Sequence, residues 1–344
     1  MTVARTVSSV DYHTAGEPFR IVVGGAPALR GETVLDRRAW AAAHADDVRQ
    51  LLVNEPRGHA DMYGCHVTPP DDDGADVGTV FFHKDGYSTA CGHGTIALVS
   101  YLLESGQLRR EGDGVHDVVV DVPSGRLPTR ATVRGGKVVE VVFRNVPSFV
   151  LDTVELTVDD RDLVVPVSFG GAFYASVDVT ALGLDLTAAS VPDLIAAGRA
   201  VRREVEAARE VVHPDEPRLC GVYGVVFHAD EPLDDGDDVQ ATGARLRQRN
   251  VTVFADGEVD RSPCGSGTSA RLAVLHAQGR LRTGEVLRHY GIAGGVFTAS
   301  VVEEVEAAGR PAVVTEVAGS AFLTGHHTFV LEEDDPLGLG FQLR

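Results

Sequence analysis

Asp260-Arg-Ser-Pro-Cys264-Gly-Ser-Gly-Thr268 is one of two related stretches in this chain, and the other is Cys91-Gly-His-Gly-Thr95. Each stretch places a cysteine before two glycines and a threonine, and each opens an apolar run of helical character. Aligned without gaps, residues 91–110 and 264–283 share nine identities. The repeat predicts two copies of one supersecondary unit, each with a cysteine at the start of a helix.

A cysteine at the start of a helix has a specific chemistry. The first backbone N–H groups of a helix have no partner within the helix, and the helix dipole adds partial positive charge there. A glycine-rich approach lets a carboxylate come close to these N–H groups. The same field favours the thiolate form of a nearby cysteine. Two such units facing each other would hold one carboxylate and place a sulfur on each side of the adjacent carbon.

The bulk composition limits the classes of function. The 344 residues suffice for two domains of ordinary size, and 44% hydrophobic with 24% charged residues is typical of a soluble globular protein. The net charge of −19 disfavours nucleic acid and anionic membrane surfaces as partners. No apolar run approaches the roughly 18 residues needed to cross a bilayer. Four widely spaced cysteines and no secretory leader predict a cytoplasmic protein without disulfides.

The order of the predicted elements indicates two domains. Asp36–Val53 has helical periodicity, and Val191–Val211 is its amphipathic counterpart in the second half. Strand patterns fill most of the remaining chain around the two cysteine loops. We therefore expect a first domain over residues 1–150 and a second over 151–324, with residues 325–344 returning to the first.

Other interpretations of the two cysteines are open to the sequence. Free cysteines are often small core residues, but Cys91 and Cys264 lie in polar, glycine-rich loops. A zinc site is disfavoured because Cys-x-His is too tight for the usual ligand spacings and the chain has no Cys-x₂-Cys. Phosphate binding at Gly265-Ser-Gly-Thr268 lacks the lysine of a P-loop. No metal site is expected.

Four further residues are candidates for the site. His93 is either a helix-start histidine bonded to the backbone or a contact to the substrate. Asp260 either caps a turn or accepts a hydrogen bond from a substrate ammonium. Tyr63 and Phe254 are either core aromatics or walls of a pocket.

The motifs resemble the two active-site signatures of the proline racemase family. Cys91-Gly-His-Gly and Asp260-Arg-Ser-Pro-Cys264-Gly-Ser-Gly-Thr carry the resemblance, which extends over nearly the whole chain. His13-Thr-Ala-Gly-Glu-Pro18, Glu55-Pro-Arg-Gly-His59 and Asp334-Asp-Pro336 add to it. The resemblance implies an α/β (α+β) fold of the diaminopimelate-epimerase-like type. In that fold, two pseudo-symmetric domains each wrap β-strands around a central helix, and the site lies in the interdomain cleft.

The resemblance also implies roles for individual residues. Cys91 and Cys264 match the paired acid and base, and Asp260 matches an aspartate that binds the substrate amine. The substrate would be held by Gly92, His93, Gly265 and Ser266. A small-molecule substrate of the proline type is expected, without cofactor or metal, and the family often forms homodimers.

This chain departs from the family pattern in two places. Ala90 stands where many members have methionine before the first cysteine. In addition, four stretches look like the trans-3-hydroxyproline dehydratase branch of the family. That branch typically carries threonine where this chain has Cys264. The four stretches are Gly86-Tyr-Ser-Thr, Gly170-Gly-Ala-Phe-Tyr174, Val222-Tyr-Gly-Val and Phe254-Ala-Asp-Gly.

The chemical requirements of inversion indicate which of the two activities to expect. Inverting a carbon needs a base on one face and a proton donor on the other, and a threonine hydroxyl donates poorly to a carbanion. Because Cys264 supplies a second thiol, we expect a racemase or 2-epimerase acting on proline or on a hydroxyproline such as trans-4-hydroxy-L-proline. The alternative is trans-3-hydroxy-L-proline dehydration. A ligand-binding protein without turnover would keep the glycine-rich cradle but would not need two cysteines.

Overall fold

The computed structural model describes residues 3–233 and 243–343. The chain divides into two compact units: one takes the chain up to Val141 and resumes at Ser320, and the other is Val142–Gly319. Residues 142–150, which the sequence assigned to the first domain, therefore group with the second unit. The reason is that β9 (Phe149–Val158) pairs along its length with β10 (Arg161–Phe169), and that the N–H groups of Asn145 and Ser148 donate to the carbonyls of Thr315 and Val313.

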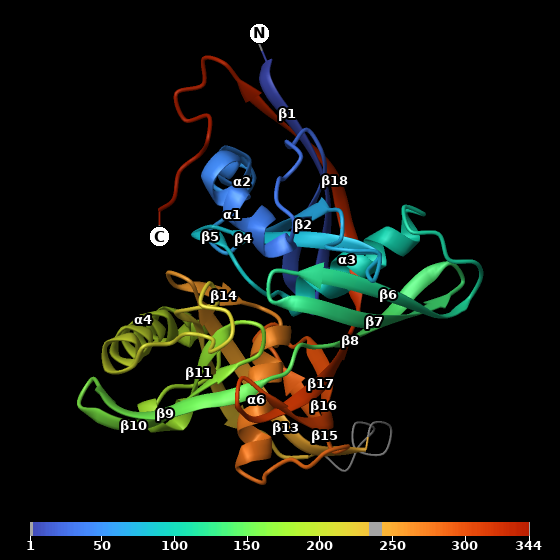
Figure 1. Cartoon of the computed structure of the whole chain (residues 1–344). Helices are drawn as coiled ribbons and strands as arrows, with labels where there is room; N and C mark the ends of the chain where they lie inside the picture. The colour runs from blue at the N-terminus through green and yellow to red at the C-terminus, as the bar shows by residue number, and fades with distance from the viewer. Residues whose placement is uncertain (1–2, 234–242, 344) are drawn as a thin grey trace. The chain divides into compact units, whose positions relative to one another are not determined.

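The described residues of the first unit form a mixed sheet and three helices. Its strands follow the order β18-β1-β2-β3-β4-β6-β7, with β2–β3 and β4–β6 parallel and the other pairs antiparallel. β1 and β18 come from opposite ends of the chain and pair side by side, blue against red in Figure 1. The strands are β1 (Val3–Thr14), β2 (Glu17–Gly24), β3 (Tyr63–Thr68), β4 (Val77–His83), β5 (Gly86–Tyr87), β6 (Gly114–Val122), β7 (Gly125–Arg134) and β18 (Ala321–Glu332); β8 (Lys137–Arg144) crosses the boundary between the units.

The second unit repeats the same pairing pattern. Its strands follow the order β9-β10-β11-β12-β13-β15-β16-β17, with β11–β12 and β13–β15 parallel and the other pairs antiparallel. The run β10 to β16 thus matches the run β1 to β7 pair by pair, as the repeated sequence predicted. The remaining strands are β11 (Phe173–Asp178), β12 (Val222–Asp230), β13 (Ala244–Phe254), β14 (Glu258–Asp260), β15 (Val286–Tyr290), β16 (Val296–Ala307) and β17 (Arg310–Gly319).

Each unit has one central helix that follows its cysteine loop. α3 (Gly92–Glu104) packs on β1, β2 and β18, and its residues from Gly92 to Leu102 are buried. α6 (Gly265–Ala277) packs on strands at both ends of its sheet, among them β9, β10, β16 and β17, and is buried from Gly265 to Leu275. A helix buried on all sides needs an apolar or internally bonded surface all round. Both helices meet this with small residues and with Ser and Thr side chains bonded to helical carbonyls.

The outer helices confirm one expectation and correct another. α4 (Val191–Ala208) forms where the amphipathic pattern placed a helix and buries Leu194, Val201 and Val205. The single helix expected over Asp36–Val53 is two helices, α1 (Val34–His44) and α2 (Asp46–Val53). The break falls at Ala45, whose φ of −136° ends α1, and Asp46 and Asp47 in the first turn of α2 favour its N-terminus. Two short 3-10 helices, Val179–Leu182 and Ala188–Ser190, precede α4.

Candidate active site

Cys91 is the residue that caps the N-terminus of α3. Its backbone is extended, with φ of −154°, and its sulfur accepts a hydrogen bond from the N–H of Gly94 at 3.3 Å. The thiol is 4% exposed, so water contributes little to its environment. An N–H donor at a helix start favours a negatively charged sulfur. The prediction that the first cysteine stands at the start of a helix is confirmed.

The imidazole of His93 lies against the Cys91 sulfur, with Nε2 at 3.4 Å and Nδ1 at 3.6 Å. Burial lowers the pKa of His93 to about 3, so the ring is neutral at pH 7. The ring makes edge-to-face contacts with Phe19 and Tyr63, and the His93 carbonyl accepts a hydrogen bond from Thr14 at 3.0 Å. His93 is therefore held in place as a neutral hydrogen-bonding group beside the sulfur.

Tyr63 belongs to this first cluster. It is 2% exposed, its ring centroid lies 5.1 Å from that of His93, and its hydroxyl donates to Ser88. From the sequence, Tyr63 has two interpretations, a core aromatic or a pocket wall. In the structure, it is a buried aromatic that touches the cluster around Cys91.

Cys264 stands at the corresponding place in the second unit, directly before α6, but its backbone differs. Its φ of +59° lies in the left-handed region, which residues other than glycine rarely adopt. Burial raises the pKa of the Cys264 thiol to about 12, and the charge of Asp260 adds to this rise. The thiol form is therefore the stable one at neutral pH, which is the state required of a proton donor.

Tyr174 on β11 connects Cys264 to Ser266. Its side chain is fully buried, and its hydroxyl lies 2.7 Å from the Ser266 hydroxyl and 3.7 Å from the Cys264 sulfur. The sequence contained Tyr174 only as part of a motif typical of one branch of the family. Its contact with the second cysteine could not be read from that motif, because β11 and α6 are brought together by the fold.

Asp260 supports the second cysteine loop from within. Its carboxylate accepts the N–H of Ser262 at 2.8 Å, and the Ser262 hydroxyl accepts the N–H of Cys264 at 3.1 Å. Burial raises the pKa of Asp260 to about 6. The structure thus shows the turn-capping role of Asp260, and binding of a substrate amine stays a prediction. Phe254 is also buried, and its ring stacks on Tyr223 with centroids 5.6 Å apart.

The second glycine of each motif has a direct steric reason. A Cβ built on Gly94 would lie 2.8 Å from the Cys91 sulfur and 2.4 Å from the Phe19 ring, and a Cβ on Gly267 would lie 2.9 Å from the Cys264 sulfur. These distances are shorter than a methyl group allows, so a side chain at either position would displace its neighbours, the sulfur among them. The second glycine of Cys-Gly-x-Gly therefore leaves room beside each thiol, and Gly94 also leaves room for Phe19.

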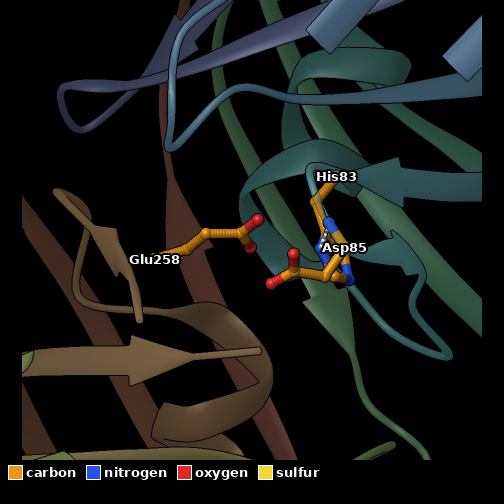
Figure 2. A group of neighbouring side chains, drawn as sticks. All are labelled: His83, Asp85 and Glu258. Carbon is orange, nitrogen blue, oxygen red and sulfur yellow. Dashed lines mark hydrogen bonds between the residues drawn. The ribbon is translucent and has the colours of Figure 1, made fainter. Parts of the chain in front are cut away.

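Two further polar residues, His83 and Asp85, shortly precede the Cys91 loop in the sequence. Figure 2 shows His83 and Asp85 at the turn between β4 and β5, where the Asp85 N–H donates to Nδ1 of His83 at 3.2 Å. His83 also packs on Tyr63, with ring centroids 5.4 Å apart. The third side chain drawn, Glu258, belongs to β14 of the second unit and is buried there.

All four cysteines are free thiols, as the sequence predicted. Cys65 is buried in β3, and burial raises its pKa to about 12, while Cys220 is exposed. Within the described residues, none of the helices has the length and apolar character needed to span a membrane.

Comparison with known proteins supports an enzyme of the amino-acid racemase and epimerase class and identifies its family. The family model described as proline racemase matches residues 9–342. The chain belongs to the proline racemase family. The predicted fold, of the diaminopimelate-epimerase-like type, is confirmed as well.

The relatives carry two activities in their names. A trans-3-hydroxy-L-proline dehydratase from Bacillus cereus is 43% identical over 344 residues, which cover 100% of both chains. A 3-hydroxyproline 2-epimerase from Burkholderia multivorans is 40% identical over 346 residues, again with 100% coverage of both. A crystal structure of a hydroxyproline epimerase from Agrobacterium vitis with bound trans-4-hydroxy-L-proline has a TM-score of 0.90 and 33% identity, covering 100% of this chain and 97% of that one.

Proposed function

We propose that this protein is a cofactor-independent 2-epimerase that inverts the α-carbon of a hydroxyproline with Cys91 and Cys264 as paired base and acid. The observation that carries the proposal is the second thiol. Each unit presents a cysteine at the start of its central helix, with a glycine two residues into the helix making room for the sulfur. A single base would suffice to remove a proton, but inversion also needs a donor for the opposite face.

The two thiols are built differently, which suits opposite roles. The Gly94 N–H donates to the Cys91 sulfur and stabilises a thiolate there. The Gly267 N–H bonds the Cys264 sulfur in the same way, but burial and the charge of Asp260 outweigh it and keep Cys264 as a thiol. In the proposed step, the Cys91 thiolate takes the α-proton and the electron pair of the C–H bond delocalises into the carboxylate. The Cys264 thiol then gives its proton to the other face of the same carbon, leaving Cys91 as thiol and Cys264 as thiolate.

The carboxylate and the ring nitrogen need partners for this step. Backbone N–H groups at a helix start stabilise the charge that develops on a carboxylate, so Gly92, His93, Gly265 and Ser266 are the proposed carboxylate contacts. Asp260 is the proposed acceptor for the ring ammonium. Its pKa of about 6 leaves it mostly ionised at neutral pH, and a bound cation would favour the ionised form further.

The names of the relatives bear on the position of the hydroxyl group in the substrate ring. The names of relatives at 43% and 40% identity contain 3-hydroxyproline, whereas trans-4-hydroxy-L-proline is bound in a structure at 33% identity. These identities support a 3-hydroxyproline ahead of the 4-hydroxyproline that the sequence suggested as an example. The expected homodimer stays a prediction, which light scattering of the purified protein checks.

Dehydration of trans-3-hydroxy-L-proline is the second candidate function, and the name of the relative at 43% identity favours it. Dehydration needs one base and a proton donor for the leaving hydroxyl. The Tyr174 hydroxyl, 3.7 Å from the Cys264 sulfur, and the Cys264 thiol itself are donors on that side. The hydroxyl would leave as water while the electron pair of the broken C–H bond forms the new double bond of the ring.

One experiment separates these functions. The protein is incubated in D₂O with L-proline, trans-4-hydroxy-L-proline and trans-3-hydroxy-L-proline, and the products are followed by NMR. Deuterium at the α-carbon with inversion supports the epimerase, and a pyrroline product supports the dehydratase. Absence of both exchange and product with all three substrates would contradict the proposal and favour a ligand-binding protein without turnover.

A further inference from the structure

The carbonyl of Pro263, directly before Cys264, is held by a closed ring of buried side chains. It accepts one hydrogen bond from Nδ2 of Asn250 on β13 at 3.0 Å and another from the hydroxyl of Thr268 on α6 at 3.1 Å. Asn250 and Thr268 are both fully buried. The peptide that joins Pro263 to Cys264 is therefore fixed from a strand and from the helix at once.

His289 on β15 closes the ring. Its Nε2 lies 2.8 Å from Nδ2 of Asn250, and its Nδ1 lies 2.8 Å from the Thr268 hydroxyl. Because an amide nitrogen only donates, Nε2 must accept, and Nδ1 carries the proton and donates to Thr268. The Thr268 hydroxyl is thereby left to donate its own proton to Pro263. Burial lowers the pKa of His289 to about 3, which keeps the ring in this neutral form.

The hydrogen-bonded ring of Asn250, Thr268 and His289 holds a backbone whose conformation is unfavourable. Cys264 has φ of +59°, whereas Cys91 has φ of −154°. A left-handed conformation is unfavourable for a residue with a side chain and persists only where the surroundings impose it. The matching threonines also differ, because Thr95 bonds the carbonyl of Cys91 itself, four residues back in the ordinary helical way. Thr268 reaches one residue further back, to the peptide that sets the direction of the Cys264 side chain.

We propose that His289, together with Asn250 and Thr268, is a positioning group that holds the Cys264 thiol in the orientation its proton transfer requires. The proposal deepens the proposed function, since it concerns the residue assigned there as the acid. It assigns none of the three residues a contact with substrate. Their effect on the reaction passes through the Pro263–Cys264 peptide alone.

The first test needs no substrate. Wild type and the variants Thr268→Val and His289→Phe are treated with iodoacetamide, and mass spectrometry gives the labelling rate of each cysteine. We expect the labelling rate of Cys264 relative to Cys91 to rise several-fold in both variants, because a loosened peptide exposes a thiol that is now 6% exposed. Buried Cys65 serves as the internal control, because faster labelling there would report general unfolding.

Conservative variants separate positioning from mere space filling. Thr268→Ser keeps the hydroxyl, and His289→Gln keeps one acceptor and one donor, so both should restore most of the wild-type labelling ratio. In the substrate assay, Thr268→Val should lower kcat by about tenfold to a hundredfold with KM nearly unchanged, because misplacing a reacting group by about 1 Å costs this much. Thr268→Ser should recover kcat.

The outcomes distinguish this inference from the proposed function. An unchanged ratio of Cys264 to Cys91 labelling in folded Thr268→Val and His289→Phe would overturn the inference, whatever the substrate proves to be. An absence of exchange and product with every proline derivative would instead overturn the proposed function and leave the labelling result valid. If the phenylalanine variant fails to fold, the valine and serine pair at position 268 decides the question alone.

Discussion

At the scale of single residues, the two thiols have different surroundings although their motifs match. Both sulfurs accept a backbone N–H, from Gly94 at Cys91 and from Gly267 at Cys264, but Cys91 lies beside a neutral imidazole and Cys264 beside a carboxylate and a tyrosine hydroxyl. A base is helped by hydrogen-bond donors, whereas a proton donor must keep its proton until the carbanion forms. The carboxylate beside Cys264 supports the proposal that Cys91 is the base and Cys264 the acid.

Replacing either cysteine by serine should abolish inversion. The hydroxyl of serine is a far weaker acid than a thiol, and losing a positioned acid or base typically costs about 10²–10⁴ in rate. In Cys91→Ser and Cys264→Ser, one thiol remains, so exchange of the α-proton from one epimer should persist more slowly. NMR in D₂O measures both quantities, and inversion at the wild-type rate in either variant would show that the two-base assignment is wrong.

Cys264→Thr should shift the balance toward dehydration of trans-3-hydroxy-L-proline. With threonine, no thiol is ready to protonate the opposite face, and the carbanion can expel the neighbouring hydroxyl instead. Cys91 remains as the base, and Tyr174 remains as a donor. A coupled assay for the pyrroline product, run beside the wild type, tests this. A variant that epimerises unchanged would show that Cys264 is not the acid.

Activity should fall in mildly acidic solution because of Asp260. Its pKa is raised to about 6 by burial, so below about pH 6 the protonated carboxyl predominates and loses its charge attraction to the ring ammonium. The value of kcat/KM should therefore fall as the pH drops through about 6 and level off above it. In Asp260→Asn the acidic limb should be absent and kcat/KM low throughout. A variant with the wild-type profile would exclude Asp260 as the titrating group.

At the scale of the elements, each central helix fixes the position of its thiol. α3 and α6 are buried on all sides, so their N-termini cannot shift without disturbing the sheets around them. Their first turns carry the glycines that leave room for sulfur. The helix thus supplies both the N–H groups and the steric slot, and a change in its first turn should affect chemistry more than stability.

Gly267→Ala tests this steric slot. The added methyl would lie 2.9 Å from the Cys264 sulfur and 3.3 Å from Val226, so the sulfur must move by a few tenths of an ångström. We expect kcat to fall about tenfold or more, with a loss of about 1–3 kcal/mol in unfolding free energy at most. Gly24→Ala is the matched control, because its methyl would meet only Ser8 at 3.8 Å. Equal activities of the two variants would contradict the account.

At the scale of the whole molecule, two units with one strand-pairing pattern each contribute one cysteine loop. The pattern of antiparallel and parallel pairs from β1 to β7 recurs from β10 to β16. The outer helices also occur at corresponding positions in the two units, with α1 and α2 between β2 and β3 and α4 between β11 and β12. A ligand that binds the native protein and not the unfolded chain stabilises the native protein against unfolding.

Pyrrole-2-carboxylate should bind and raise the melting temperature. Its ring is planar at the α-carbon and resembles the carbanion stage of the proposed reaction, which an epimerase holds more tightly than the substrate. Binding to the native state alone adds about 2.7 kcal/mol of stability at a ligand concentration of 100 Kd. Titration calorimetry and thermal melts measure this. Absence of binding at millimolar ligand to folded protein would argue against a proline-type substrate.

The sequence by itself determined the repeat, the family and the place of each cysteine before a helix. These features are local, since a glycine-rich turn followed by an apolar helical run is written in consecutive residues. The pattern over Asp36–Val53 was read correctly as helical, but the break at Ala45 was missed because no proline or glycine marks it.

Only the tertiary structure decided what surrounds the thiols. The Tyr174 hydroxyl reaches Cys264 across 90 positions of sequence, and His289 reaches Thr268 across 21. Such contacts depend on which strands pair and in which register, and a histidine in a short strand carries no local sign of its partners. Burial, and with it the raised pKa of Cys264, follows from the same packing. The two cysteines that we propose to act could therefore be identified from the sequence, whereas the side chains that surround them are brought there only by tertiary packing.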